Sequence, residues 1–264
     1  MYIVRQLVVF AVISAVVLGC GGSSKGSDAA EPPAINQKVL NGVELARSQS
    51  PEIVELLTDR SSCTAALISY YQVITAAHCV VEAEVAYVRD SDRYYPVQAM
   101  HVHPNYEVNE RGLLYDVALV DFSPPADRTL VTLPLLVTYD PELYSVLQVF
   151  GFGIADVTKS PWYFGTLRTG SVLLSETSEL FHVTHYSDHL SSVCYGDSGG
   201  PLIYTAIPRG LASELQPANA RAMVAGVTSF TTELNCQGDS HYTRLQNEEV
   251  LRFLLELAPE AEYF

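Results

Sequence analysis

One segment of the chain carries the residue types that nucleophilic catalysis needs. Residues 192–201 read Ser-Val-Cys-Tyr-Gly-Asp-Ser-Gly-Gly-Pro, so Ser198 follows an acid and precedes two glycines. A serine hydroxyl is a weak nucleophile unless a base takes its proton and N–H donors hold the oxyanion that forms after attack. Because Gly196 has no side chain, its N–H and that of Ser198 can converge on one oxygen. The alternative interpretation is a surface turn, since Gly-Asp-Ser-Gly is also good turn chemistry.

A base and an orienting acid elsewhere in the chain decide between these interpretations. His78 stands in the segment Thr-Ala-Ala-His-Cys, and Asp116 begins the segment Asp-Val-Ala-Leu-Val. Together with the segment around Ser198, these resemble the three signatures of the chymotrypsin/trypsin-like serine proteases, in the same chain order. The resemblance implies that His78 is the general base, that Asp116 orients it and that Ser198 attacks the substrate. It also implies an oxyanion hole formed by the N–H groups of Gly196 and Ser198.

The resemblance further implies a substrate pocket beside the nucleophile. Its floor is the residue six before Ser198, which is Ser192, so an acidic floor that selects Arg or Lys is not supported. The segment Ser-Phe-Thr at 229–231 resembles the Ser-Trp-Gly edge of the family, with a β-branched side chain at the pocket mouth. Asp239 leaves the register of the opposite wall open by one or two residues. We expect cleavage after small or medium uncharged side chains, with a pocket made by Ser192, Tyr195, Ser229, Phe230, Thr231 and Ser240.

The chain departs from the family pattern at Thr64-Ala65, where two glycines are common. This change removes no catalytic group. A second function class is a catalytically silent, lipid-anchored binding protein on the same fold. Silent members of the family usually lose the serine, the histidine or the glycines, and all of these are present here. The sequence therefore favours an endopeptidase.

The N-terminus has the pattern of an export signal. Arg5 is followed by Leu7 to Leu18, which are apolar except for Ser14, and the run ends at Gly19-Cys20. A membrane-spanning helix needs about 20 apolar residues, so residues 1–19 are predicted to be a secretory signal. The segment Val-Leu-Gly-Cys resembles a bacterial lipobox, which implies a lipid on Cys20 and anchoring at a periplasmic or cell-surface membrane face. The alternative is an ordinary signal peptide with a spare cysteine.

Five cysteines leave one over after pairing, which in an exported chain calls for an explanation. The family resemblance pairs Cys63 with Cys79 and Cys194 with Cys236, and leaves Cys20 for the lipid. No Cys-x-x-Cys occurs, so no metal cage is expected. His182, His185 and His189 lie in a strand-like stretch that does not place all three on one face, so no metal site is expected there either. We expect no cofactor.

Residues 20–38 are rich in Gly, Ser, Ala and Pro and predict a flexible tether or propeptide before a protease domain at 39–264. Val39-Leu40-Asn41-Gly42 resembles the Ile-Val-Gly-Gly start of the family and follows Lys38. The resemblance implies that another protease cuts after Lys38, that the new α-amino group pairs with Asp197, and that the domain leaves its lipid behind. Without that partner, Asp197 would be a costly buried charge and the loop would be disordered. The alternative is that Lys38 lies merely in a tether and Asp197 pairs elsewhere.

Charge and pattern define the remaining expectations. The 264 residues carry 15 Lys+Arg against 30 Asp+Glu, a net charge of −15, which would repel nucleic acid. We expect protein or peptide substrates and a monomer. Short β-branched and aromatic runs between turn residues predict an all-β fold. They are residues 65–69, 73–75, 85–88, 97–102, 117–122, 146–150, 171–174 and 223–229.

The family resemblance implies two six-stranded antiparallel barrels with the site between them. His78 and Asp116 would come from the first barrel and Ser198 from the second. At the end of the chain, Asn247 can cap a helix in which Val250, Phe253, Leu254 and Leu257 recur at helical spacing. Pro259 marks its end. Residues 204–222 are expected to form an extended surface loop.

Overall fold

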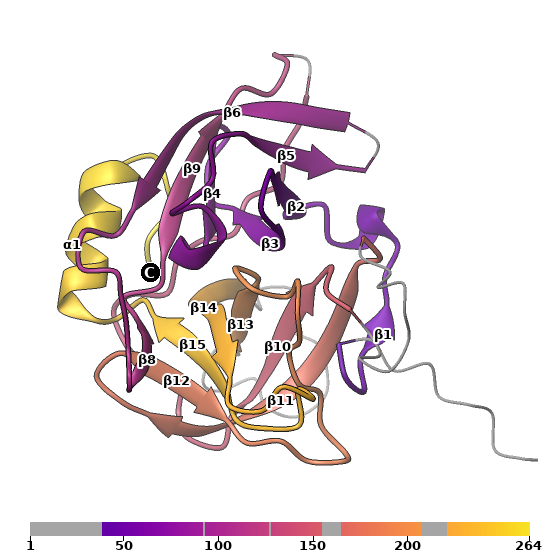
Figure 1. Cartoon of the computed structure of the whole chain (residues 1–264), viewed down its shortest axis with the longest axis vertical. Coiled ribbons are helices and arrows are strands. Elements are labelled where there is room, and N and C mark those ends of the chain that lie inside the picture. Colours follow the sequence, from indigo (N-terminus) through magenta and orange to yellow (C-terminus); the bar gives the residue numbers. More distant parts are fainter. Residues whose placement is uncertain (1–38, 92, 127, 155–164, 207–220) are drawn as a thin grey trace, which may run out of the picture. The chain divides into compact units, whose positions relative to one another are not determined.

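A computed structural model of the chain describes residues 39–91, 93–126, 128–154, 165–206 and 221–264. The expected signal peptide, tether, Cys20 and Lys38, and most of the expected loop at 204–222, lie outside the described residues. The described ends of that expected loop, residues 204–206 and 221–222, are strand instead, because they continue the pairing of two neighbouring strands. Within the described ranges, no helix is long and apolar enough to cross a membrane. Figure 1 shows two groups of strands, one from each half of the sequence.

Six strands from the first half close into an antiparallel barrel in the order β2-β3-β4-β9-β6-β5. Its interior is filled by apolar side chains with almost no exposure, among them Leu56, Val73 and Leu119. The strands are β2 (Ile53–Thr58), β3 (Ser62–Leu67), β4 (Gln72–Thr75), β5 (Ala86–Asp90), β6 (Arg93–Val102) and β9 (Ala118–Phe122).

Six strands from the second half follow the order β11-β10-β13-β14-β15-β12, and pairing of β11 with β12 closes the ring. A short strand, β1 (Val43–Glu44), adds to the outer edge of β11. Two six-stranded antiparallel barrels were predicted, and this prediction is confirmed. The strands are β10 (Val146–Gly151), β11 (Arg168–Thr177), β12 (Phe181–Thr184), β13 (Pro201–Ala206), β14 (Arg221–Thr231) and β15 (Ser240–Arg244).

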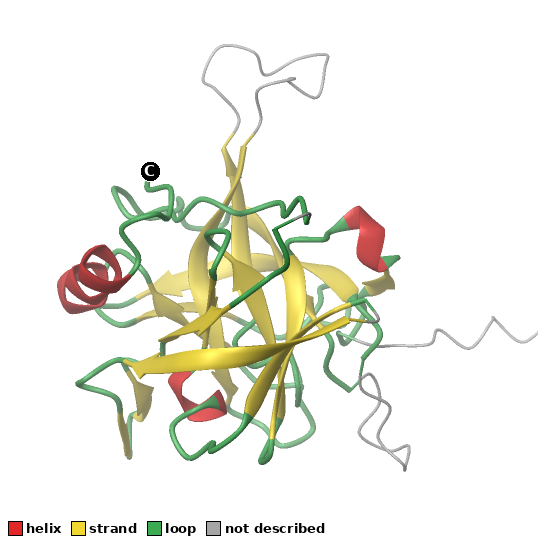
Figure 2. Cartoon of the chain, turned by 90° about the horizontal axis from the view of Figure 1, so that it is seen from above, coloured by secondary structure: helices red, strands yellow, loops and turns green. Residues whose placement is uncertain are grey.

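Helix α1 (Glu248–Leu257) closes the chain where the sequence predicted a helix. The side chain of Asn247 accepts the N–H groups of Glu249 and Val250, so the predicted cap is present. Val250, Phe253 and Leu254 pack against the core of the first barrel. Figure 2 shows this helix at the rim of a molecule made mostly of strands, with the short helices η1 (Arg47–Gln49) and η2 (Ala77–Cys79).

A hairpin of β7 (Glu107–Asn109) and β8 (Gly112–Leu114) reaches from the first half of the chain to the second barrel. Gly112 has a φ of +110° and lies against the ring of Phe230, where an added Cβ would come within 2.4 Å of the ring. Only glycine fits this contact, so the hairpin is fixed beside the strand that carries Ser229.

Both expected disulfides are present, Cys63–Cys79 and Cys194–Cys236. The first ties η2 to β3, and the second ties the segment before Ser198 to the turn after β14. Each cross-link restrains a loop that carries an expected site residue.

Candidate active site

His78 lies in η2, directly after β4, and faces the side chain of Asp116. The Nδ1 atom of His78 lies 2.7 Å from Oδ2 of Asp116, and the backbone N–H of His78 donates to Oδ1 at 2.9 Å. Both oxygens of the carboxylate are thus bound to one residue. With Nδ1 engaged, Nε2 is the ring nitrogen that can exchange a proton with another group.

Asp116 is fully buried between β8 and β9. Tyr115, before it, has a φ of +51° and stacks on His103, with ring centroids 5.0 Å apart. Ser229 Oγ donates to Oδ2 of Asp116 at 2.5 Å, and Thr243 Oγ1 donates to its backbone carbonyl at 2.9 Å. A buried carboxylate with several donors stays fixed, so Asp116 can hold the imidazole in one orientation.

Ser229 reaches Asp116 because β14 is irregular at this point. Thr228 pairs with Tyr242 and Phe230 with His241, so Ser229 is an extra residue in the ladder. A bulge of this kind redirects a side chain. The second barrel therefore supplies a hydrogen bond to an acid that comes from the first.

Ser198 and His78 line the same cavity of about 280 Å³. The two residues come from different barrels, which meet at this cavity. The remaining lining is mainly apolar and hydroxylic, with one acid, Glu233, among the described lining residues. The other residues are Leu113, Val193, Cys194, Tyr195, Thr228, Ser229, Phe230, Thr231 and Leu234.

Gly196 adopts a φ of +92°, a backbone conformation that favours glycine. In the part of the chain that the structure describes, the backbone N–H groups of Gly196 and Ser198 donate to no protein acceptor. Two such donors, two residues apart and beside a serine hydroxyl, can bind an oxyanion.

Four of the six expected pocket residues line the cavity: Tyr195, Ser229, Phe230 and Thr231. The structure places the other two, Ser192 and Ser240, outside the lining. Both are buried to about 1% exposure, and their hydroxyls lie 3.1 Å apart. The two hydroxyls form a hydrogen bond with each other because β15 brings Ser240 next to the segment before Cys194.

Asp239 also lies outside the lining, and its Oδ1 is 2.8 Å from Nδ1 of His185. The carboxylate of Asp239 therefore contacts His185 at the surface and does not line the cavity. Sequence reasoning missed these lining residues: Leu113, Val193, Cys194, Thr228, Glu233 and Leu234. Leu113 belongs to a hairpin remote in sequence, and no local signal identifies it.

Asp197 is fully buried, and its carboxylate oxygens accept the N–H groups of Gly153 and Cys194, each at 2.9 Å. Gly151 and Gly153 pack against it, and a Cβ at Gly151 would come within 2.0 Å of Oδ1. Burial raises the pKa of Asp197 to about 7, against the lowering effect of the two N–H groups and the charge of Arg168. The surroundings of Asp197 therefore favour the protonated carboxylic acid over the charged carboxylate.

The segment after the expected activation point is docked on the second barrel. Val39 is buried in the cluster that includes Leu147 and Val172, and Leu40 pairs with Ser192 in an isolated β-bridge. The position of Lys38 is outside the described residues.

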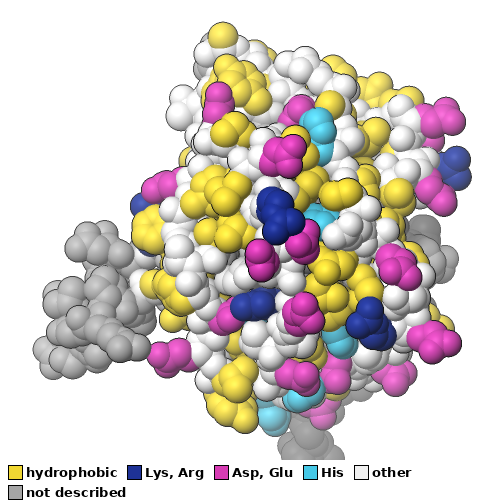
Figure 3. All heavy atoms as spheres, turned by 90° about the vertical axis from the view of Figure 1, so that its left-hand side faces the viewer, with side chains coloured by type: hydrophobic (Ala, Val, Ile, Leu, Met, Phe, Trp, Pro, Cys, Tyr) yellow, Lys and Arg dark blue, Asp and Glu magenta, His cyan; other side chains and the backbone are white. Residues whose placement is uncertain are grey.

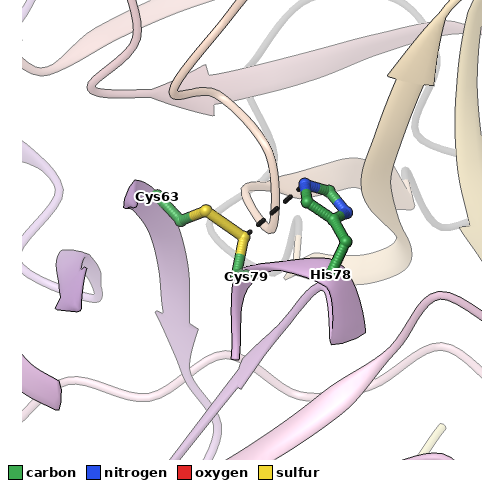
Figure 4. Close-up of side chains that lie close together, drawn as sticks. All are labelled: Cys63, His78 and Cys79. Carbon is green, nitrogen blue, oxygen red and sulfur yellow. Dashed lines mark hydrogen bonds between the residues drawn. A yellow bond between two sulfur atoms is a disulfide. The ribbon is translucent and has the colours of Figure 1, made fainter. Parts of the chain in front are cut away.

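The disulfide Cys63–Cys79 and His78 lie close together, as Figure 4 shows. The Nε2 atom of His78 is 3.8 Å from Sγ of Cys79. Three such groups could hold a metal ion if both cysteines were thiolates. Because the sulfur atoms are bonded to each other, the site lacks the thiolate ligands that a metal would need.

The three histidines at 182–189 have separate environments. His182 is fully buried between Thr177 and Gln246, and burial lowers its pKa. His185 pairs with Asp239, and His189 is exposed. They do not converge on one point.

Comparison with known proteins assigns the chain to a family. The trypsin family profile matches residues 39–250, which include His78, Asp116 and Ser198. The chain belongs to the trypsin family. Trypsin-family membership supports serine endopeptidase activity.

Curated relatives in the trypsin family are similar over most of their length. Chymase of Rattus norvegicus is 28% identical over 228 residues, covering 75% of this chain and 90% of that protein. Kallikrein 1-related peptidase b1 of Mus musculus is 27% identical over 217 residues, covering 71% and 82%. Chymotrypsin-like elastase family member 1 of Rattus norvegicus is 26% identical over 243 residues, covering 77% and 83%.

Among solved structures, the human heparin binding protein superposes with a TM-score of 0.64 and 20% identity, covering 83% of this chain and 96% of that one. At this identity the likeness shows the fold alone.

Proposed function

We propose that the chain hydrolyses peptide bonds through Ser198, His78 and Asp116. The observation that carries this proposal is that His78, oriented through Nδ1 by a buried carboxylate, lines the same cavity as the hydroxyl of Ser198. The two N–H groups of Gly196 and Ser198 supply the electrostatic part of the site.

The reaction proceeds in two halves. Ser198 Oγ attacks the carbonyl carbon of the substrate while His78 Nε2 takes its proton, and the N–H groups of Gly196 and Ser198 hold the oxyanion. The imidazolium then gives its proton to the leaving amine, and an acyl-enzyme ester remains on Ser198. Water, activated by His78, attacks this ester, and the proton returns to Ser198 as the acid product leaves.

Hydrolysis of a peptide substrate by wild type and by the Ser198→Ala and His78→Ala variants, each first cut so that Val39 is its N-terminus, tests this proposal. Each variant should lose several orders of magnitude in kcat/KM, because the remaining rate comes only from binding and the oxyanion donors. Equal turnover by wild type and Ser198→Ala would refute it.

For specificity, we propose small or medium uncharged side chains at the position before the cleaved bond. Ser192 and Ser240, which lie outside the lining, are neutral and bound to each other, and Thr231 presents a branched side chain in the lining. Among the described lining residues the one acid is Glu233, and it is exposed to solvent after β14, so it would leave a buried cation unpaired. A peptide library should show cleavage after Ala, Val or Leu and poor cleavage after Arg and Lys, because a buried cation without a counter-charge is costly.

Dominant cleavage after Arg would contradict this specificity. Glu233→Gln would then identify the responsible acid, since only a preference set by Glu233 disappears in this variant.

The second candidate function is a silent binding protein on the same fold. The structural neighbour is named for heparin binding, and heparin-like polyanions need a basic surface. This chain has a net charge of −15, and the face in Figure 3 shows scattered acidic side chains with few basic ones. A polyanion is therefore a poor ligand, and the endopeptidase is the better proposal.

We also propose activation by cleavage after Lys38 and anchoring of the uncut chain through a lipid on Cys20. The burial of Val39 and of Asp197 in the second barrel supports the activation step. The location at a bacterial periplasmic or cell-surface membrane rests on the lipobox-like segment alone. Full-length protein treated with trypsin should gain activity, show Val39 as its N-terminus and leave the detergent phase. Full activity in a chain still intact at Lys38 would refute the activation step.

A further inference from the structure

Thr64 lies in β3 of the first barrel and is fully buried against the loop that carries Ser198. Its Oγ1 donates to the carbonyl oxygen of Gly196 at 2.9 Å and accepts the N–H of Phe152 at 3.0 Å. The hydroxyl thus uses its only proton and one lone pair, and it joins three segments that are remote in sequence.

Three successive N–H groups after β10 hold the same loop. The N–H of Phe152 donates to the Thr64 hydroxyl, which in turn holds the loop, and the N–H of Gly153 donates to Oδ1 of Asp197 at 2.9 Å. Ile154 donates to the carbonyl oxygen of Tyr195 at 2.7 Å. The peptide groups on both sides of Gly196 are therefore anchored, the one before it by Ile154 and the one after it by Thr64.

This anchoring determines the direction of the Gly196 N–H. In a trans peptide group the N–H and C=O bonds point in opposite directions, so the N–H of Gly196 points away from Ile154. Glycine rotates more easily than any other residue. The following peptide group is held at both ends: its N–H, from Asp197, donates to the carbonyl oxygen of Cys194 at 3.0 Å, and its carbonyl accepts the Thr64 hydroxyl. Together these bonds hold Gly196 at its φ of +92°.

We propose that Thr64 is a positioning residue for the oxyanion hole: its hydroxyl fixes the Gly196–Asp197 peptide group and so presets the Gly196 N–H toward the carbonyl oxygen of the substrate. The inference rests on the proposed function and adds to it a residue that does not touch the substrate. Preset donors stabilise the oxyanion without reorganisation during the reaction.

The hydroxyl can be tested separately from the backbone of Thr64. Its N–H donates to the carbonyl oxygen of Ser198 at 2.9 Å, and its carbonyl accepts Thr75 Oγ1 at 2.9 Å. Both bonds survive any side-chain change. Thr64→Val keeps the shape and loses the hydroxyl, whereas Thr64→Ser keeps the hydroxyl and loses the methyl group.

The experiment measures kcat, KM and the affinity for two matched inhibitors in the activated protein. A peptide aldehyde forms a hemiacetal with Ser198 whose oxyanion needs the donors, and the corresponding peptide alcohol binds without one. In Thr64→Val we expect kcat and aldehyde affinity to fall by about 10- to 100-fold, with KM and alcohol affinity within about twofold. Thr64→Ser should retain kcat to within about threefold.

Three results would overturn the proposal: wild-type kcat and aldehyde affinity in folded Thr64→Val, an equal loss of alcohol affinity, or the same loss of kcat in Thr64→Ser. If Thr64→Val does not fold, as judged by its thermal melt, Thr64→Ala is measured against the same criteria. An inactive wild type would refute the proposed function instead, so the two failures are distinguishable.

Discussion

The hydroxyl of Ser229 donates to the same carboxylate oxygen of Asp116 that lies 2.7 Å from Nδ1 of His78. This contact joins the second barrel to the acid of the first. It depends on the irregular pairing of β14, which turns Ser229 inward.

Ser229→Ala should therefore lower kcat by about 10- to 100-fold, because a hydrogen bond to a charged group contributes roughly 1.5–3 kcal/mol. Asp116→Asn should cost much more, on the order of 10⁴-fold, since it changes the tautomer of the histidine. Steady-state kinetics on both variants give the comparison. A larger loss in Ser229→Ala than in Asp116→Asn would contradict this ordering.

A histidine base acts only when neutral, so kcat/KM should rise with pH in a single step between about pH 5 and 8. The measurement is a pH–rate profile of the activated protein on an uncharged peptide. A rate independent of pH over that range would contradict the role of His78.

Burial of Asp197 predicts a pH dependence of stability that differs before and after cleavage at Lys38. Its folded pKa of about 7 lies above the ordinary aspartate pKa of 3.8. Below about pH 4 both the folded and unfolded states hold the proton, and between about 4 and 7 only the folded state does. An uncut chain that keeps Asp197 buried, as in this structure, should lose on the order of 4 kcal/mol of stability over this window and no more above it. An uncut chain whose Asp197 loop is disordered should show no such fall.

After cleavage, the α-amino group of Val39 would support the charge of Asp197, so this fall should disappear. Urea unfolding at pH 5 and pH 8 tests it with three proteins: uncut, cut, and uncut Asp197→Asn. The same pH dependence in uncut wild type and uncut Asp197→Asn would show that Asp197 is not the responsible group.

The two disulfides should contribute unequally to stability. The pair Cys194–Cys236 spans 42 residues and the pair Cys63–Cys79 spans 16, which correspond to roughly 4 and 3 kcal/mol in the chain-entropy account. Replacement of both cysteines of a pair by alanine, followed by urea unfolding, measures each. Removal of Cys194–Cys236 should also raise KM, because Cys194 lines the cavity. A larger loss of unfolding free energy on removal of Cys63–Cys79 would contradict the account.

Sequence patterns predicted the parts of the fold whose signal is local. Each of the eight predicted runs overlaps an observed strand, and the cap at Asn247 starts α1. Strand β2 was missed because Glu55 interrupts its apolar pattern. That carboxylate is buried to about 1% exposure beside Arg47 and Arg89, which come from other segments. Strand β13 was not predicted because it begins with Pro201, a residue that is rare in strands.

The site was predictable where short motifs carry it and not where the barrels meet. His78, Asp116, Ser198 and both disulfide pairs followed from the family resemblance. The closure of Ser192 on Ser240, the lining by Leu113 and the bond from Thr64 to Gly196 depend on contacts between residues remote in sequence. The sequence showed Thr64 only as a residue at a position where glycine is common, and it did not show which group the Thr64 hydroxyl contacts.

The most direct test of the central claim is covalent labelling of the activated chain by a fluorophosphonate, with mass spectrometry of the labelled peptide. We predict one label per chain at Ser198, a loss of labelling in Ser198→Ala, and labelling slowed by several orders of magnitude in His78→Ala because the serine then lacks its base. Labelling at another residue, or the same rate in wild type and His78→Ala, would contradict the account.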